Sequence, residues 1–385
     1  MNIEIHVIQN FAPSCLNRDD TNTPKDCVFG GVRRARISSQ CIKRAIRTSR
    51  VFQAELRDFL ANRSLRFPEQ VRRSLVKMGV SEETARAAAA ELQKIAMKEK
   101  GEGEEPAKVK SKKDSSEVIA LRTPQMIFFG AEEVEECARL IKELLDSGAE
   151  PRDLLKSILD KRRKHIPFPV PKSADIALFG RMVTSDAFIG VDAACQVAHA
   201  ISTHRVDIDF DFYTAVDDLQ PREEAGAGMM GMTGYNSACF YRFAVLDLDQ
   251  LEENLCGDKE LARRTAEAFL RSAINSVPSG RQTTFAAYNP PSLIFAVVRE
   301  DGSWNLANAF EKPVRATGEM GIVDASILSL DDHYGKLKGV YGTRGLVREY
   351  HVVLGDGSEL KNLGTNARDL ETLIHGVMGA IQSAA

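Results

Sequence analysis

Residues 206–249 read VDIDFDFYTAVDDLQPREEAGAGMMGMTGYNSACFYRFAVLDLD, and this stretch indicates the fold class. Its first eleven residues alternate between apolar side chains and aspartates or small residues, which is typical of a strand with one wet face. Residues 237–249 predict a second, more apolar strand, and the glycine- and methionine-rich segment 226–236 lies between the two. The pattern therefore predicts a long β-hairpin over about 204–240.

The elements on either side of this hairpin predict a mixed α+β fold. Residues 3–7 alternate as a first strand, and a capped basic helix begins near residue 38. Beyond the hairpin, residues 248–277 have the apolar spacing of helices, and residues 291–301 form a further strand. The resulting order of strand, helix, strand, strand, helix and strand is that of a ferredoxin-like sheet.

A charged helical region interrupts this pattern between residues 51 and 165. The stretches 55–79, 81–100 and 131–148 all repeat apolar residues with the 3.6-residue period of an amphipathic helix. We interpret the region as an insertion into a fold that begins at residue 1. Residues from about 98 to 118 contain almost no large apolar side chains, so they predict a mobile loop.

Positive charge is concentrated near the N-terminus. Residues 13–47 read PSCLNRDDTNTPKDCVFGGVRRARISSQCIKRAIR, and nine basic but only three acidic residues lie between Arg18 and Arg50. The whole chain has a formal net charge of −3. Such a local excess of cations is the electrostatic footprint of a confined polyanion site.

The end of this basic stretch predicts an amphipathic helix. Ser38 and Ser39 are candidate N-caps, because a hydroxyl accepts hydrogen bonds from the free amides of a first turn. Those amides also favour a phosphate. One face of the helix is apolar, and the polar face holds Gln40, Lys43, Arg44 and Arg47. Each piece alone is compatible with a solvated surface helix, but together they favour phosphate-backbone binding.

Two other segments carry cations in patterns that suit a phosphate. Arg34 and Arg36 alternate with Ala35 and Ile37, which predicts a strand with one wet, basic face. Near the C-terminus, residues 335–345 (GKLKGVYGTRG) combine four glycines with three cations. We expect a glycine loop there, since glycine allows a backbone to approach a phosphate closely.

Several function classes lack their sequence signatures. There is no GxxxxGK[ST] or HExxH motif, the seven cysteines form no CxxC pair, and the RRM aromatic signature is missing. The N-terminus does not read as a signal peptide, and no apolar stretch approaches membrane-spanning length. We expect a cytoplasmic, non-enzymatic protein with reduced thiols that has no catalytic residue, metal ligand, cofactor or membrane partner.

The motifs resemble those of a known family. Residues 13–47 are similar to the N-terminal signature of the type I-E CRISPR Cascade backbone protein, the CasC family of the RAMP superfamily. The resemblance continues in order through residues 175–186, 198–220, 240–244, 283–290 and 306–314, which read DIALFGRMVTSD, AHAISTHRVDIDFDFYTAVDDLQ, FYRFA, TTFAAYNP and LANAFEKPV. Residues 51–165 are not covered by it.

The resemblance implies an architecture and a role. It implies a modified RRM-like palm at 1–50 and 166–385, helical fingers at 51–165, and a β-hairpin thumb at 204–240. Copies would stack head to tail along a guide RNA (crRNA) as a helical filament, and each thumb would displace one nucleotide at a regular interval. The segments between would pair with a target DNA strand, beside other Cascade subunits, and a recruited helicase-nuclease would degrade the DNA.

The resemblance also implies which residues contact the RNA. The expected backbone contacts are Arg18, Lys25, Ser38, Gln40, Lys43, Arg44, Arg47 and Lys312. Phe212 and Tyr213 would wedge at the displaced base, and Met182 would stack there from the palm. Contacts to phosphate and ribose carry no sequence information, which suits a protein that must accept any guide.

Two enzymatic alternatives remain open from the sequence. One is a metal-dependent ribonuclease that cuts target RNA, for which Asp19, Asp20 and Asp26 are the nearby carboxylates. The other is processing of the guide precursor by acid–base catalysis with His6 or His199.

Overall fold

The computed structural model describes residues 1–93, 121–151, 154, 172–182, 190–216, 227–355 and 357–384. The expected loop at 98–118 and residues 217–226 of the predicted hairpin lie outside these ranges. The described chain divides into two compact units. The sheet unit comprises Met1–Glu55, Cys195–Leu248 and Arg264–Ala385, and the helical unit comprises Leu56–Ala194 and Asp249–Arg263. The expected boundaries of palm, fingers and thumb stay predictions.

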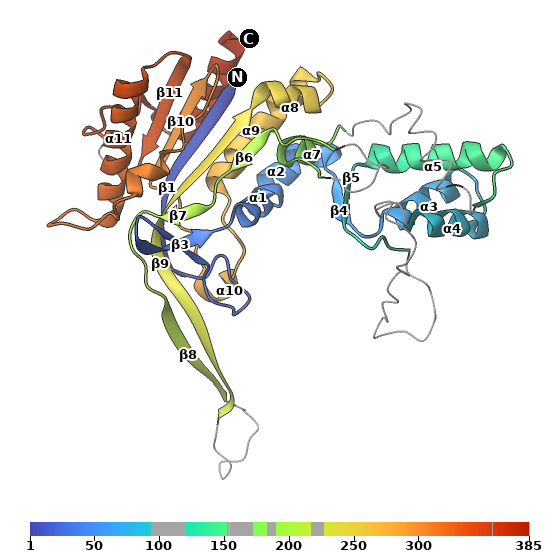
Figure 1. Cartoon of the computed structure of the whole chain (residues 1–385), viewed down its shortest axis with the longest axis horizontal. Helices are drawn as coiled ribbons and strands as arrows, with labels where there is room; N and C mark the ends of the chain where they lie inside the picture. Colours follow the sequence, from blue (N-terminus) through green and yellow to red (C-terminus); the bar gives the residue numbers. More distant parts are fainter. Residues whose placement is uncertain are drawn as a thin grey trace. The chain divides into compact units, whose positions relative to one another are not determined.

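A large mixed sheet forms the sheet unit (Figure 1). Its strands are β1 (Asn2–Ser14), β2 (Asp26–Phe29), β3 (Val32–Ile37), β6 (Cys195–Val197), β7 (Ala200–Ser202), β8 (Asp209–Val216), β9 (Ala227–Asp247), β10 (Leu293–Arg299), β11 (Leu346–Val353) and β12 (Thr365–Asn366). They lie in the order β12-β11-β10-β1-β9-β7-β3-β2, and β6 and β8 also pair with β9. The pairings are antiparallel except that of β11 with β12.

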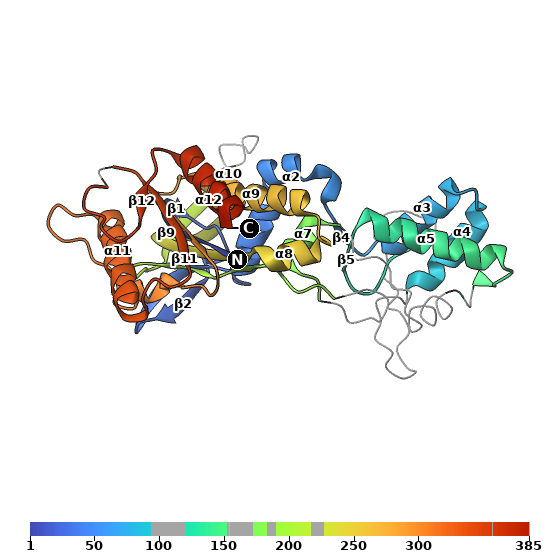
Figure 2. The same cartoon turned by 90° about the horizontal axis from the view of Figure 1, so that it is seen from above.

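Helices cover both faces of this sheet. The helices that lie wholly in the sheet unit are α1 (Ser39–Arg47), α2 (Arg50–Glu55), α10 (Gln282–Phe285), α11 (Ile322–Tyr341) and α12 (Leu370–Ala384), and two more, α8 (Leu248–Asn254) and α9 (Lys259–Asn275), cross the unit boundary. Figure 2 shows α11 and α12 on opposite sides of the sheet. Phe295 and Val297 of β10 pack with Leu330 and Tyr334 of α11 in one buried cluster. The predicted α+β class is confirmed.

Strand β9 is longer than the sequence indicates. It begins at Ala227, within the glycine- and methionine-rich segment, whereas the predicted strand begins at residue 237. Two glycines allow this extension because other groups occupy the space of a side chain. A Cβ on Gly231 would lie 2.4 Å from the ring of Tyr213, and one on Gly234 would lie 3.2 Å from Thr23. The β8–β9 hairpin therefore continues directly from the central sheet (Figure 1).

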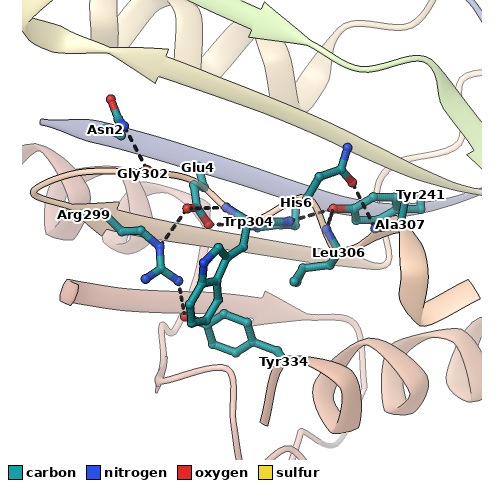
Figure 3. Close-up of polar contacts among 11 residues, drawn as sticks. Asn2, Glu4, His6, Tyr241, Arg299, Gly302, Trp304, Leu306, Ala307 and Tyr334 are labelled. Carbon is teal, nitrogen blue, oxygen red and sulfur yellow. Dashed lines mark hydrogen bonds and ion pairs between the residues drawn. The ribbon is translucent and has the colours of Figure 1, made fainter. Parts of the chain in front are cut away.

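A buried polar network ties β1 to the segment that follows β10 (Figure 3). Glu4 accepts hydrogen bonds from the guanidinium of Arg299 at 2.8 Å and from the backbone N–H of Trp304 at 3.0 Å. Arg299 also donates to the hydroxyl of Tyr334 at 3.3 Å, and its guanidinium lies 4.0 Å from the centre of the Trp304 ring. The buried carboxylate is therefore matched by a cation and by a backbone donor, as burial of a charge requires.

His6 extends this network to the next segment. Its Nε2 lies 3.2 Å from Glu4 and its Nδ1 lies 2.9 Å from the hydroxyl of Tyr241, which accepts the backbone N–H of Leu306 at 2.9 Å. Each ring nitrogen of His6 therefore has one hydrogen-bond partner. The contacts fix the short 3-10 helix η5 (Leu306–Phe310), which leads to Lys312.

The expected glycine loop at 335–345 is wrong for most of its length. Residues up to Tyr341 continue α11, and Gly335 lies inside that helix. A Cβ on Gly335 would lie 2.6 Å from the side chain of Asn362, so this glycine serves close packing. Lys338 donates to Glu349 at 3.2 Å and to the carbonyl of Asn362 at 2.6 Å, which commits it to the fold.

The helical unit has its own core. Its elements are the 3-10 helix η1 (Arg57–Phe59), β4 (Asn62–Ser64), α3 (Phe67–Lys77), α4 (Glu82–Glu91), β5 (Ile127–Phe129), α5 (Ala131–Asp146) and α7 (Ala174–Phe179). Apolar residues of α3, α4 and α5 form one buried cluster, so the predicted helical character of this region is confirmed where it is described. The antiparallel pair β4–β5 has no counterpart in the sequence prediction, because strands of three residues are too short to show a period.

Candidate nucleic-acid interface

A tightly hydrogen-bonded loop follows β1 and carries the first two predicted contacts. Asn17 joins its two ends: its side chain accepts the backbone N–H of Ser38 at 2.9 Å, and its carbonyl accepts that of Lys25 at 2.9 Å. Within the loop, Asp19 accepts hydrogen bonds from Thr21 and Thr23, which lower the pKa of its carboxyl group. The loop therefore presents an exposed Arg18 and a half-buried Lys25 from a fixed backbone.

The turn between β2 and β3 meets a distant segment that carries a lysine. Gly30 and Gly31 both have positive φ (59° and 75°), as the tight turns of hairpins require. A Cβ on Gly30 would lie 1.7 Å from the carbonyl oxygen of Glu311, so only glycine fits. Because the two backbones meet here, the exposed Lys312 lies close to the β2–β3 turn.

Arg34 corrects the expected wet, basic face of β3. Its side chain is fully buried, and its guanidinium donates to the carbonyls of Phe29 (3.1 Å), Ser202 (3.1 Å) and Phe310 (2.7 Å). Burial lowers its pKa. The cation is therefore a structural anchor that joins the β2–β3 hairpin to β7 and η5. The sequence pattern missed this because η5, which covers that face, comes from far along the chain.

Helix α1 has the predicted cap and the predicted two faces. The hydroxyl of Ser38 accepts the backbone N–H of Cys41 at 3.4 Å, and Ile42 and Ile46 are buried. On the other face Gln40 and Arg44 are exposed, and Lys43 and Arg47 are half-buried. Ser38 is itself buried at the cap, so its predicted contact with RNA stays a prediction.

A small pocket connects the loop to the sheet. It is lined by Ser14, Leu16, Asn17, Pro24, Lys25, Arg36, Ile37, Asn236 and Phe240. Arg36 donates to the carbonyl of Asp26 at 3.0 Å and lies 3.1 Å from Nδ1 of the exposed His199. Burial, followed by the charges of Arg36 and Lys25, lowers the pKa of His199. These cations and amides provide donors for an anion.

The hairpin residues predicted as wedges are exposed but lie on different faces. Phe212 is 64% exposed and pairs with Met232, whereas Tyr213 is 41% exposed and lies across Gly231. Successive side chains of a strand point to opposite faces. The two aromatic rings are therefore presented to opposite sides of the hairpin.

Met182, the remaining predicted contact, belongs to the helical unit. Arg181 fixes the backbone just before it, because this buried guanidinium pairs with Glu133 at 2.8 Å and donates to the carbonyl of Phe128 at 2.9 Å. The side chain of Met182 is 96% exposed. A long apolar side chain is thus presented to solvent from a rigid anchor.

Most residues of the enzymatic alternatives have structural partners, whereas Asp20 is exposed. Asp19 is engaged by the two threonines, and Asp26 pairs with Arg33 at 2.9 Å. His6 is buried with both ring nitrogens in contact. The ranges that the structure describes contain no group of three or more His, Cys, Asp or Glu side chains placed to hold a metal ion. Nor does a helix in those ranges combine the length and apolar character needed to cross a bilayer.

The sheet unit thus holds the predicted contacts other than Met182, and it adds residues that the sequence did not single out as contacts. Arg36, His199, Asn17 and Asn236 join Lys25 around the pocket and its edge. Arg36 lies within the basic stretch between Arg18 and Arg50, so the sequence did mark it as a candidate for anion binding. His199, between β6 and β7, and Asn236, in β9, lie outside that stretch and have no such signal in the sequence.

A family model and two solved structures relate this chain to CRISPR proteins. The family model for CT1975-like protein, a Cas family, matches residues 3–375. A solved chain described as "CRISPR RNA-guided surveillance complex, pre-nicking" superposes with a TM-score of 0.81 and 30% identity, over 99% of this chain and 100% of that chain. Another, described as "CRISPR RNA-guided surveillance complex", has a TM-score of 0.70 and 26% identity over the same shares. Comparison with curated proteins returns no match. Since the family model spans nearly the whole chain, the protein belongs to the CT1975-like family of Cas proteins.

Proposed function

We propose that this chain is a backbone subunit of a CRISPR surveillance complex that holds a guide RNA by its phosphates and riboses. The observation that carries the proposal is the cationic site of the sheet unit. The loop after β1, the pocket around Lys25 and Arg36, and the polar face of α1 present cations from a rigid framework. Sequence-independent contacts of this kind suit a protein that leaves the bases free to pair with target DNA.

We further propose that the sheet is a modified ferredoxin-like, RRM-type palm. The order β10-β1-β9-β7 supports this, because β1 and β9 are the first and third strands of a βαββαβ unit and lie at its centre. Helices α1 and α9 would be the two helices of that unit. The β8–β9 hairpin would be the thumb and the helical unit would contribute the fingers. Within the Cas proteins, the motifs quoted above support the type I-E, CasC assignment.

In this proposal the subunit works by assembly and has no catalytic activity. Copies stack head to tail along the crRNA in the cytoplasm, beside other Cascade subunits, and a recruited helicase-nuclease cuts the DNA. The aromatic residues of the hairpin give the thumb a ring on each face, so it could separate neighbouring nucleotides. Incubating the assembled complex with complementary RNA and magnesium tests the non-catalytic role, and cutting at regular spacing would contradict it.

The interface is tested by removing two cations of α1. We expect Lys43→Ala combined with Arg47→Ala to weaken binding of every RNA sequence. Each phosphate contact contributes about 0.7 to the slope of log affinity against log salt for a single strand, so the slope should fall by about 1.4. The matched control is Lys336→Ala with Arg348→Ala, which removes the same charge from exposed positions on α11 and β11. An unchanged slope in the first variant would show that the groove is assigned wrongly.

The scaffold role is tested by co-expressing the chain with a repeat–spacer RNA. We expect a large particle that contains several copies, protects a spacer-length RNA and dissociates when ribonuclease is added. A monomer that protects no RNA, even with the partner subunits present, would contradict the proposal.

A further inference from the structure

The segment 279–289, SGRQTTFAAYN, has no assigned role but is held in an unusual conformation. Arg281 and Ala286, on either side of α10, both have positive φ (47° and 46°), which non-glycine residues rarely adopt. Backbone strain of this kind clusters at functional sites. The surroundings therefore impose this conformation on the chain.

Contacts from several directions hold the segment in place. A Cβ on Gly280 would lie 2.3 Å from the carbonyl oxygen of Leu16, so the segment presses against the end of the β1 loop. At the other end, the carbonyl of Asn289 accepts a hydrogen bond from Gln9 at 2.7 Å. Gln9 in turn accepts from the buried Arg242 at 2.5 Å, whose guanidinium also donates to the last carbonyls of α9.

The segment also braces the base of the β8–β9 hairpin on one particular face. Arg281 donates to the hydroxyl of Thr233 at 3.1 Å, and the rings of Phe285 and Tyr235 lie 5.8 Å apart. Thr233 and Tyr235 are on the same face of the hairpin as Tyr213, because residues two apart on a strand, and directly paired residues, share a face. The opposite face meets the loop after β1, where Gly234 packs against Thr23.

The polar groups of this segment are suited to an anion. Between Ser276 and Arg299 the sequence contains no acidic residue. The buried Nε of Arg281, a donor, has no hydrogen-bond partner among the described residues, while Thr283, Thr284 and Tyr288 are exposed.

We propose that residues 281–288 are a second RNA-binding element, which holds the strand on the Tyr213 side of the hairpin. Arg281 supplies a cation for a phosphate, and the exposed ring of Tyr288 supplies a stacking surface for a base or ribose. The loop after β1 and α1 hold the strand on the other side, so the hairpin separates two cationic walls. This inference rests on the proposed RNA-binding function and adds a site to it.

The test measures affinity of the full chain for a single-stranded repeat–spacer RNA at several salt concentrations. Stacking on an aromatic side chain changes affinity by about 5- to 100-fold when the ring is removed, so we expect a loss in that range for Tyr288→Ala and little change for Tyr288→Phe. The control is Tyr341→Ala, which removes an equally exposed ring from α11.

The charge of Arg281 is tested separately from its bracing role. We expect Arg281→Gln to reduce the salt slope by about 0.7, as loss of one contact to a single strand does. Thr233→Val removes the hydrogen-bond acceptor of Arg281 but keeps the cation, so it should leave the slope unchanged. If both Arg281→Gln and Thr233→Val alter affinity equally without altering the slope, Arg281 is only a brace and its proposed phosphate contact is overturned.

The outcomes distinguish this inference from the proposed function. If Tyr288→Ala binds RNA as Tyr341→Ala does, while the Lys43→Ala, Arg47→Ala variant loses affinity, the first interface stands and the second element is refuted. If the wild-type chain and its co-expressed complex bind no RNA, both proposals fail. Because Tyr288 is exposed, its variant decides the question even if Arg281→Gln does not fold.

Discussion

Two of the three arginines of β3, Arg34 and Arg36, should respond in opposite ways to the same substitution. Arg34 is buried and anchors three strands and η5 through backbone carbonyls, whereas Arg36 is half-buried at the edge of the pocket. We expect Arg34→Met to lower the free energy of unfolding without removing a contact to RNA. Arg36→Met should weaken RNA binding and leave stability nearly unchanged.

The magnitude for Arg34 follows from its hydrogen bonds. Three carbonyls accept from it at 2.7–3.1 Å, and a fourth, that of Glu311, lies at 3.3 Å. Hydrogen bonds to a charged group contribute about 1.5–3 kcal/mol each, but the substitution also removes the cost of burying the charge. We therefore expect a net loss of about 2–4 kcal/mol, part of it from carbonyls left without a donor.

Denaturant unfolding and salt-dependent RNA binding together provide the assay. Arg34→Met should shift the unfolding midpoint with an unchanged m-value, and its salt slope for RNA should equal that of the wild type at concentrations where the variant is folded. Arg36→Met should reduce the slope by about 0.7. A variant Arg34→Met that is as stable as the wild type but has a reduced slope would refute the reasoning.

Three further predictions concern pH and packing. Burial, followed by the charges of Arg36 and Lys25, lowers the pKa of His199 below its ordinary value of 6.5, and a bound phosphate would raise it again. RNA affinity should therefore rise as pH falls below about 6.5, and His199→Ala should remove this dependence in a binding titration. Hydrogen bonds from Arg72 lower the pKa of Glu69 to about 2, against 4.5 for the free group. The contribution of Glu69 to stability is therefore full above pH 4.5 and is lost as pH falls towards 2. The Glu69→Gln variant should lack this pH-dependent loss of stability in acid unfolding curves. Gly231→Ala would place a Cβ 2.4 Å from the Tyr213 ring and should weaken RNA binding as much as Tyr213→Ala does, measured by the same titration.

Local sequence patterns predicted the elements whose cause is local. The cap of α1 and its two faces depend on residues within one helix, and both were confirmed. The hairpin follows from strict alternation in β8, although β9 starts earlier than predicted because Gly231 and Gly234 accommodate groups from elsewhere. A pattern of two or three residues, as in β4 and β5, contains too little information to be seen.

Features that depend on distant segments could not be predicted from a single stretch. In the sequence Arg34 looks like the other arginines of β3, and only the fold shows that η5 covers it. Lys338 belongs to α11, in which Gly335 leaves space for the side chain of Asn362. Likewise His199 meets Arg36 at the edge of the pocket only because β7 pairs with β3. The charge of a residue was visible in the sequence, but its partner was not.

The continuity of β9 has a consequence for how this protein can change in evolution. One strand runs from the pairing with β1 into the pairing with β8, so the hairpin inherits its orientation from the core. Inserting one residue in each strand between these two pairings would exchange the faces that Phe212 and Tyr213 occupy, whereas inserting two residues in each strand would preserve them. Relatives whose hairpins differ in length between the core and this aromatic pair should therefore differ by an even number of residues in each strand, or compensate with a β-bulge.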